Sequence, residues 1–196
     1  MADAGIGAVL LAAGRGTRFG TAPKLLAPLD GKPLVRHAAE AALASKVRPV
    51  VVVLGAHADA VRTALDGLDV AFVVNPDFAA GLSTSLRSGL SVLPADSPAA
   101  VILLGDMPRV TAGQIDRLAA AYRAARPSPA AIVPVVEGRR GNPVLLDRRI
   151  LGDALASLSG DHGAGPLLKG RTDVLEIAGE PGTALDVDTP EMLVRL

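Results

Sequence analysis

The chain has 196 residues, which is enough for one compact domain with a substantial core. Apolar residues make up 49% of it but aromatic residues only 2%, and 20 basic side chains balance 20 acidic ones. This composition argues against nucleic-acid and membrane partners, and the absence of cysteine excludes disulfides, thiolate catalysis and sulfur-ligated zinc. No apolar run reaches the roughly 20 residues that span a bilayer, and the N-terminus lacks a basic signal region. We therefore expect a cytoplasmic monomer.

Apolar runs and helical stripes alternate along the first two thirds of the chain. Continuous apolar runs predict buried strands at 6–13, 50–54, 70–74, 101–104 and 130–136. Apolar residues at helical spacing predict helices at 35–42, 61–68, 83–93 and 111–122, with Ser83 and Thr111 beginning the last two. Residues 25–34 are interpreted as a loop that closes over the site after the first strand. The alternation predicts an α/β fold with a doubly wound, mostly parallel, Rossmann-like sheet.

The pattern loosens after residue 136. Residues 137–146 have the composition of a hairpin or small β-arm, and 151–158 carry another helical stripe. A glycine-rich loop at 160–165 precedes short predicted strands at 174–177 and 184–187, and Thr189 begins a last helix. The sequence shows neither an internal repeat nor a linker, so we expect residues 1–196 to form a single domain.

A glycine-rich basic segment directly follows the first strand and is the clearest functional signal. Glycines at 14, 16 and 20 let the backbone turn tightly and point N–H groups at a ligand, and positive charge comes from Arg15, Arg18 and Lys24. The spacing fits neither a Walker A loop nor the dinucleotide fingerprint, because Phe19 occupies the position of the third glycine. We interpret the segment as a phosphate cradle; the alternative for each cation is a solvated surface position.

Polar side chains follow several predicted strands at the edge where ligands bind in parallel sheets. Asn75 follows the third strand and Asp106 the fourth. Asp106 is either a Mg²⁺ ligand or a cap of the next turn or helix. Asp186 and Asp188 flank Val187, so in a strand both carboxylates lie on one face. Asp188 also has the spacing of a helix cap, which makes Asp186 the stronger metal candidate.

Three further residues have a structural alternative. Ser83 and Ser85 have the positions of a helix cap and a helix-face hydroxyl, and their closeness to Asn75 leaves recognition of a base or ribose open. His162 lies between glycines and is most simply a loop residue. No Ser/His/Asp or Cys/His set suitable for nucleophilic catalysis is apparent.

Together these segments resemble the MobA-like nucleotidyltransferases, and within them the molybdenum cofactor cytidylyltransferase branch. The resemblance covers nearly the whole chain in order, and its motifs are 11-LAAGRGTRFG-20 with 23-PKLL-26, 81-GLSTSL-86, 104-LGDMP-108, 141-GNPV-144, 160-GDHGA-164 and 186-DVDTPE-191. It implies transfer of CMP from CTP to the terminal phosphate of molybdopterin, with release of pyrophosphate. Ala13 matches the Ala-Ala-Gly of the cytidylyl branch and favours CTP over GTP.

The resemblance also assigns roles to individual residues. It implies catalytic roles for Lys24, Arg18 and Asp106, and a Mg²⁺ cofactor held by Asp106 with Asp186 or Asp188. It implies nucleotide contacts from Leu11, Ala12, Ala13, Gly14, Arg15, Gly16, Thr17, Lys24, Asn75, Gly81 and Ser83. It implies acceptor contacts from Asn142, Asp161, His162 and Gly163, and a molybdoenzyme as a partner that receives the product.

Other functions stay open from the sequence. One is an NAD(P)-dependent reductase, a label attached to some relatives, although the broken dinucleotide fingerprint argues against it. Others are a GTP-using enzyme, a sugar-phosphate or terpenoid-precursor nucleotidylyltransferase, and a carrier of molybdenum cofactor without catalytic activity.

Overall fold

The computed structural model describes residues 5–19 and 22–194. Within them the main sheet has eight strands in the order β10–β7–β9–β6–β1–β4–β5, with β8 paired to β7. Neighbouring strands are parallel except at β8 and β9, and β9 runs antiparallel to both β6 and β7. The strands are β1 (Gly7–Ala12), β4 (Val50–Leu54), β5 (Ala71–Val74), β6 (Ala99–Leu104), β7 (Ala131–Val136), β8 (Arg139–Arg140), β9 (Val144–Asp147) and β10 (Val174–Ala178). The predicted mostly parallel α/β sheet is confirmed.

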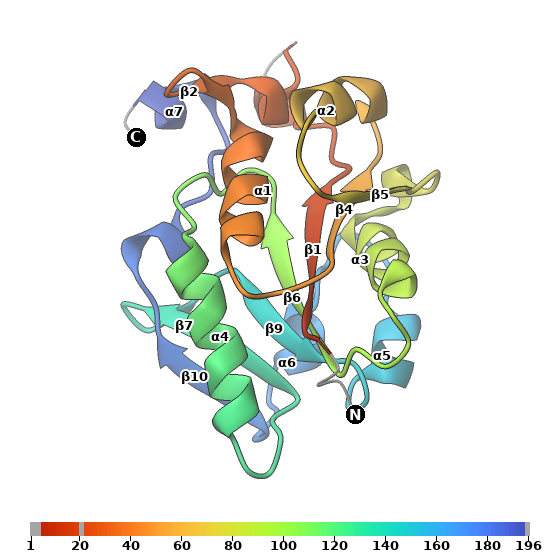
Figure 1. The fold of residues 1–196 in the computed structure, drawn as a ribbon, viewed down its shortest axis with the longest axis vertical. Helices are drawn as coiled ribbons and strands as arrows, with labels where there is room; N and C mark the ends of the chain where they lie inside the picture. Colours follow the sequence, from red (N-terminus) through yellow and green to blue (C-terminus); the bar gives the residue numbers. More distant parts are fainter. Residues whose placement is uncertain (1–4, 20–21, 195–196) are drawn as a thin grey trace.

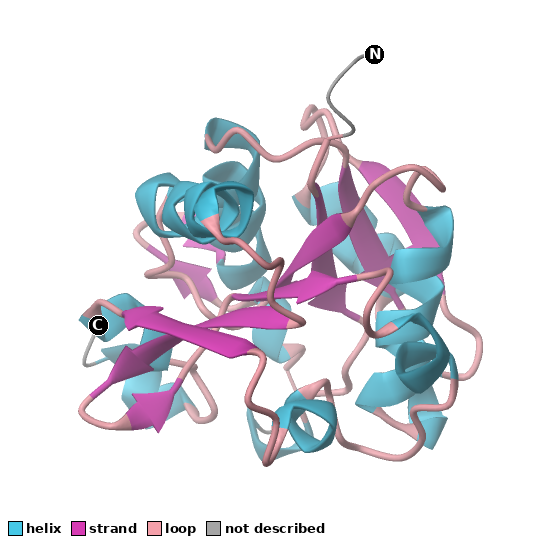
Figure 2. Cartoon of the chain, turned by 90° about the horizontal axis from the view of Figure 1, so that it is seen from below, coloured by secondary structure: helices cyan, strands magenta, loops and turns pink. Residues whose placement is uncertain are grey.

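Helices cover both faces of this twisted sheet (Figures 1 and 2). Side chains of β1 alternate between two cores: Ala8 and Leu10 pack with α1, α2 and α4, and Val9 and Leu11 pack with α3, α5 and α6. In Figure 1, α1 and α4 lie in front of the strands. The helices are α1 (Leu34–Ala44), α2 (Ala58–Ala64), α3 (Leu82–Val92), α4 (Ala112–Ala124), α5 (Gly152–Ala156), α6 (Gly165–Leu168) and α7 (Pro190–Val194). Within the described ranges, no helix is long and apolar enough to cross a membrane.

Arginine side chains satisfy the carbonyl groups that three helices leave unpaired at their C-terminal ends. Arg48 donates to the carbonyls of Ala42 and Leu43 in the last turn of α1. Arg36 donates to the Ala64 carbonyl at the end of α2, and Arg148 reaches backbone carbonyls near the end of α3. The Arg36 and Arg148 bonds also tie α2 and α3 to segments distant in the sequence, whereas the Arg48 bonds are local.

The five strands predicted between residues 6 and 136 are present, and each begins and ends within two residues of its predicted bounds. Thr111 caps α4 as expected, because its hydroxyl accepts from Gln114 N–H at 3.3 Å and the Gln114 side chain accepts from Thr111 N–H at 2.8 Å. Ser83 does not cap α3, so that prediction is wrong. The helix begins at Leu82 after Gly81, whose φ of 114° and contact with the Gly160 backbone leave no room for a side chain.

Two further regions also differ from expectation. Residues 25–34 contain the 3₁₀-helix η2 (Lys24–Leu26) and a small hairpin of β2 (Pro28–Leu29) and β3 (Lys32–Pro33). Its turn residues, Asp30 and Gly31, have φ of 50° and 77°, as expected for an Asp-Gly hairpin turn. The predicted β-arm corresponds to β8, whereas β9 joins the centre of the main sheet.

The strand predicted at 184–187 is wrong. The 3₁₀-helix η4 (Pro181–Ala184) occupies its beginning, and residues 185–189 have no regular structure. Short apolar runs near prolines do not specify a strand unless a neighbouring strand is available for pairing. Asp186 and Asp188 therefore do not share a strand face.

Gly89 brings α3 against the sheet. A Cβ atom at Gly89 would lie 2.3 Å from Val9 Cγ1 and 2.8 Å from Val53 Cγ2. We expect Gly89→Ala to lower the free energy of unfolding by about 1–3 kcal/mol through overpacking, despite the better helix propensity of alanine. Gly113→Ala in α4 is the matched control. It meets nothing closer than 3.9 Å, so it is expected to raise stability by up to about 1 kcal/mol. Urea unfolding of both variants checks the pair, and equal effects would contradict the packing argument.

Candidate functional site

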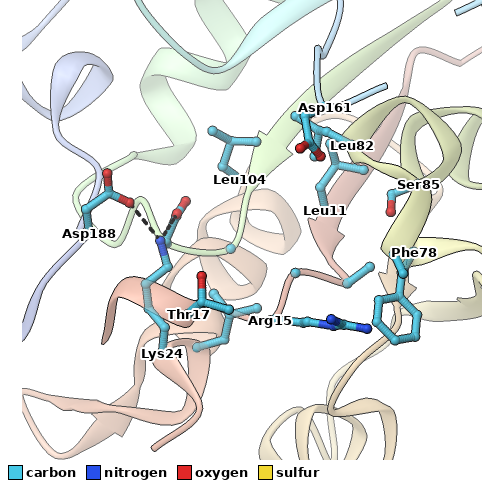
Figure 3. A pocket seen from close by; sticks show the side chains of 17 residues that line it. Leu11, Arg15, Thr17, Lys24, Phe78, Leu82, Ser85, Leu104, Asp161 and Asp188 are labelled. Atoms are coloured by element: carbon cyan, nitrogen blue, oxygen red, sulfur yellow. Dashed lines mark hydrogen bonds and ion pairs between the residues drawn. The ribbon is translucent and has the colours of Figure 1, made fainter. Parts of the chain in front are cut away.

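A cavity of about 580 Å³ lies at the carboxyl ends of β1 and β6. The glycine-rich loop after β1 forms one wall, and the start of α3 with the preceding 3₁₀-helix η3 (Phe78–Ala80) forms another (Figure 3). The lining residues are Leu11, Ala13, Gly14, Arg15, Gly16, Thr17, Lys24, Leu25, Phe78, Ala79, Leu82, Ser85, Leu104, Gly105, Asp106, Asp161 and Asp188.

Lys24 lies between two carboxylates at one end of the cavity (Figure 3). Its Nζ is 2.6 Å from Asp106 Oδ2 and 3.1 Å from Asp188 Oδ1. Gly16 permits this approach, because it has a φ of 61° and a Cβ atom there would lie 2.7 Å from Lys24 Cβ. The loop after β1, the corner after β6 and the segment before α7 therefore converge on one charged centre.

A backbone hydrogen bond brings the two acidic segments together. Val187 N–H donates to the Asp106 carbonyl at 3.0 Å. The Val187 side chain is fully buried in a small apolar cluster with Phe19, Ala27 and Leu29, among others. This anchoring places Asp188, the next residue, beside Asp106 without a regular strand.

The charge on Lys24 is stabilised by its partners. Burial alone disfavours the ammonium form, but the charges and hydrogen bonds of Asp106 and Asp188 outweigh it and raise the pKa of Lys24 above 10.5. Only 12% of the Lys24 side chain is exposed, so solvent screens these interactions weakly. Lys24 is a fixed positive charge throughout the physiological range.

Arg15 reaches across the cavity toward the wall opposite Lys24. Its guanidinium lies over the Phe78 ring, 5.5 Å from the ring centroid (Figure 3). This distance is within the range of a cation–π contact. The cavity thus has a polar, charged end at Lys24 and a more apolar end at Phe78.

The family model for the MobA-like NTP transferase domain matches residues 8–175. The chain belongs to this family. The crystal structure of the Rv0371c homologue from Mycobacterium sp. strain JC1 is similar, with a TM-score of 0.81, 34% identity and coverage of 97% of this chain and 93% of that one. A nucleotidyl transferase from Methanothermobacter thermautotrophicus, Mth528, has a TM-score of 0.81 at 27% identity and covers 97% and 95% of the two chains.

Curated relatives of this MobA-like chain carry different names. Nicotine blue oxidoreductase of Paenarthrobacter nicotinovorans is 35% identical over 96% of this chain and 94% of its own length. The bifunctional protein GlmU of Paraburkholderia xenovorans is 30% identical over 93% of this chain, which spans about half (47%) of that protein. The family and its homologues make the chain an enzyme of the nucleotidyltransferase class.

Divalent metals are general in this family, and one solved structure of Rv0371c from Mycobacterium tuberculosis is a complex with manganese. The cavity's donor set suits such an ion, because the Asp106 and Asp188 carboxylates both point at one cationic centre. No group of three or more His, Cys, Asp or Glu side chains suitable for a metal exists among residues 5–19 and 22–194. A site of two carboxylates completed by substrate phosphate oxygens is the arrangement that Mg²⁺ favours.

Ten of the predicted site residues line the cavity, most of them in or near the glycine-rich loop. Leu11, Ala13, Gly14, Arg15, Gly16, Thr17, Lys24, Asp106, Asp161 and Asp188 line it. The Arg18 side chain lies outside the described part of the structure. Ala12 is buried and packs on the other face of β1, toward α1. The roles of all these residues stay predictions.

The remaining predicted residues lie away from the cavity wall. Asn75, Gly81, Ser83, Asn142, His162, Gly163 and Asp186 are absent from its lining. Asp186 is exposed, because the segment around it is not a strand. Ser83 is completely buried, and its hydroxyl has no hydrogen-bond partner among the described residues. The geometry therefore favours Asp188 over Asp186 as the partner of Asp106.

Sequence reasoning missed several lining residues, most of them apolar. Leu25, Phe78, Ala79, Leu82, Leu104 and Gly105 line the cavity. Ser85 lines it too; the sequence indicates a helix-face hydroxyl at this position and leaves recognition of a base or ribose open. Apolar residues in loops carry no chemical signature, so no signal distinguishes Phe78 from a core residue. For Ser85 the sequence does contain a signal, because Ser85 lies one helical turn after Gly81, at the start of the helix that faces the site.

Lys24 supports a prediction about stability and pH. Lys24→Met is expected to lower the free energy of unfolding by about 2 kcal/mol at pH 7, because hydrogen bonds to charged groups contribute about 1.5–3 kcal/mol. The pKa of Lys24 is raised on folding, so its contribution is fully present below pH 10.5 and is lost as the pH rises through the higher folded value. Urea unfolding of both proteins between pH 7 and 11.5 measures this difference.

Lys32→Met is the matched control, because Lys32 pairs with Glu40 at 2.7 Å but is 49% exposed. Exposed pairs contribute about 0–1 kcal/mol, so this variant should change stability little. An effect of Lys24→Met no larger than that of Lys32→Met would contradict the proposed role of the charged centre.

Proposed function

We propose that the enzyme transfers CMP from CTP to the terminal phosphate of a molybdopterin-type acceptor and releases pyrophosphate. One observation carries this proposal: Lys24 Nζ lies 2.6 Å from Asp106 Oδ2 in a cavity that is also lined by the glycine-rich loop. A triphosphate with bound magnesium requires carboxylates for the metal ion, and a cation and free backbone N–H groups for the phosphates. Lys24, the two aspartates and the glycine-rich loop provide these groups. The Ala12-Ala13-Gly14 sequence supports CTP over GTP through its resemblance to the cytidylyl branch.

In this reaction an oxygen of the acceptor phosphate attacks the α-phosphorus of CTP, and the bond from that phosphorus to the pyrophosphate oxygen breaks. The backbone N–H groups from Gly14 to Thr17 bind the β- and γ-phosphates. Lys24 binds the α-phosphate and stabilises the negative charge that develops there. Asp106 and Asp188 would hold Mg²⁺, which when bound neutralises phosphate charge.

The acceptor needs no general base, because a phosphate monoester is already ionised near neutral pH. The enzyme's contribution is therefore positioning and electrostatic stabilisation. Asp161 lines the cavity at the top of Figure 3, beside Leu82. Its position supports the acceptor contact that the family resemblance implies for this residue.

The reaction can be tested directly. Incubation with CTP, Mg²⁺ and molybdopterin under anaerobic, reducing conditions is expected to release pyrophosphate and to form a cytidylylated product, detected by mass spectrometry. Parallel reactions contain a sugar phosphate or a terpenoid-precursor phosphate as the acceptor, or GTP as the donor. Release of pyrophosphate only with one of those substrates would assign the enzyme to another branch of the family.

Variants of the three acidic residues test the metal centre. Asp106→Ala is expected to reduce the turnover number by at least about 10²-fold, the usual cost of losing one key electrostatic group, and Asp188→Ala is expected to reduce it similarly. Asp186→Ala should retain most activity, because Asp186 is exposed and outside the cavity wall. Asp96→Asn, on an exposed loop before β6, is the control. Loss of activity in Asp186→Ala with normal activity in Asp188→Ala would reverse the assignment.

A second function is favoured by one observation, the name of the 35% identical relative, nicotine blue oxidoreductase. We propose NAD(P)H-dependent reduction as the alternative. Calorimetric titrations with NADPH and with CTP plus Mg²⁺ distinguish the two. Our first proposal predicts CTP binding and at most weak NADPH binding, whereas tight NADPH binding without CTP binding would favour the reductase.

A further inference from the structure

Asn75 is buried beneath the cavity and its amide group has a fixed orientation. Only 2% of the residue is exposed. The backbone N–H of Asp77 donates to Asn75 Oδ1 at 3.0 Å. An N–H donor requires the carbonyl oxygen on that side, so the Asn75 NH₂ group must face the other way.

That NH₂ group points at two hydroxyl groups of α3. Asn75 Nδ2 is 2.8 Å from Thr84 Oγ1 and 3.0 Å from Ser85 Oγ, and it has one hydrogen for each. Both hydroxyl oxygens therefore accept. The Thr84 proton has its own acceptors nearby, the Gly81 carbonyl at 2.8 Å and the Asp77 carbonyl at 3.0 Å.

The Ser85 proton has a different environment. Only 3% of Ser85 is exposed. Among the described residues, no protein atom accepts a hydrogen bond from the Ser85 hydroxyl. Ser85 lines the cavity, beside Phe78 and at the opposite end from Lys24 and Asp188 (Figure 3). A buried hydroxyl that accepts from Asn75 has its proton left to donate into the cavity.

We propose that Asn75 is a positioning residue that makes Ser85 a hydrogen-bond donor to the base of the bound nucleotide. This inference rests on the proposed function only in that a nucleotide lies in the cavity with its phosphates at Lys24. Its base then lies at the Phe78 end, and the ring atom that faces Ser85 must be an acceptor. Cytosine has an acceptor at N3, whereas uracil has an N3–H donor there, so this polarity selects cytosine over uracil.

The substitution Asn75→Asp reverses the polarity with almost no change of shape. One carboxylate oxygen still accepts from Asp77 N–H, but the other now accepts the Ser85 proton, which leaves only lone pairs facing the cavity. We expect the ratio of dissociation constants for UTP and CTP to shift toward UTP by about tenfold relative to the wild type, which corresponds to about 1.4 kcal/mol. Calorimetry with Mg²⁺ and each nucleotide, without any acceptor, measures this ratio.

Two further variants guard against misfolding caused by a buried carboxylate. Asn75→Ala frees the Ser85 hydroxyl to rotate, and Ser85→Ala removes it, so both are expected to reduce the preference for CTP several-fold. Ser88→Ala is the control, because the Ser88 hydroxyl lies one turn later in α3 and donates to the Thr84 carbonyl. It should leave the ratio unchanged.

The outcomes separate this inference from the proposed function. Equal weakening of CTP and UTP binding in the Asn75 variants would mean that Asn75 only supports the fold, and it would overturn the inference. A wild-type protein that binds both pyrimidine nucleotides equally would overturn it too, and would leave nucleotidyl transfer intact. A wild-type protein that binds no nucleotide would overturn both.

Discussion

The site depends on one charged centre in which Lys24 lies at hydrogen-bond distance from both Asp106 and Asp188. Two half-buried carboxylates so close together repel each other unless a cation lies between them. The fold meets this requirement by joining three distant segments, with Gly16 making room for Lys24 and Val187 fastening the second acid to the first. The same pair of carboxylates is suited to a divalent ion, and Lys24 is suited to a phosphate. This arrangement contains the charges that nucleotidyl transfer needs.

The two ends of the cavity have different chemistry, and different parts of the fold build them. The charged end is made by loops after β1 and β6 and by the irregular segment before α7. The other end is made by η3 and α3, where Asn75 organises the hydroxyl groups of the first helical turn. Gly89 holds α3 close to β1 and β4, so the packing of one helix against the sheet fixes where this wall of the cavity lies relative to Lys24.

The fold class was predictable because its signals are local and strong. Buried parallel strands such as β1 and β4 are continuous apolar runs, and the helices between them carry apolar stripes. The prediction failed where a segment depends on distant partners. Residues 184–187 have the composition of a strand but pair with no strand among the described residues, and β9 pairs with β6 and β7 inside the main sheet. Ser83 resembled a cap, but the helix begins at Leu82 and its N-cap is Gly81, where the Gly160 backbone leaves no room for a side chain.

By itself the sequence determined the alternating α/β architecture, the glycine-rich turn and the identity of the cationic and acidic groups. These properties follow from residue type and short-range spacing, which the chain carries in any conformation. Only the tertiary structure decided that Asp188 and not Asp186 meets Lys24, that Ser85 and not Ser83 lines the cavity, and that Asn75 donates a hydrogen bond to the Ser85 hydroxyl. Each of these outcomes depends on which side chains meet when separate segments pack together. The spacing of residues within one segment does not determine which residue of another segment it will contact.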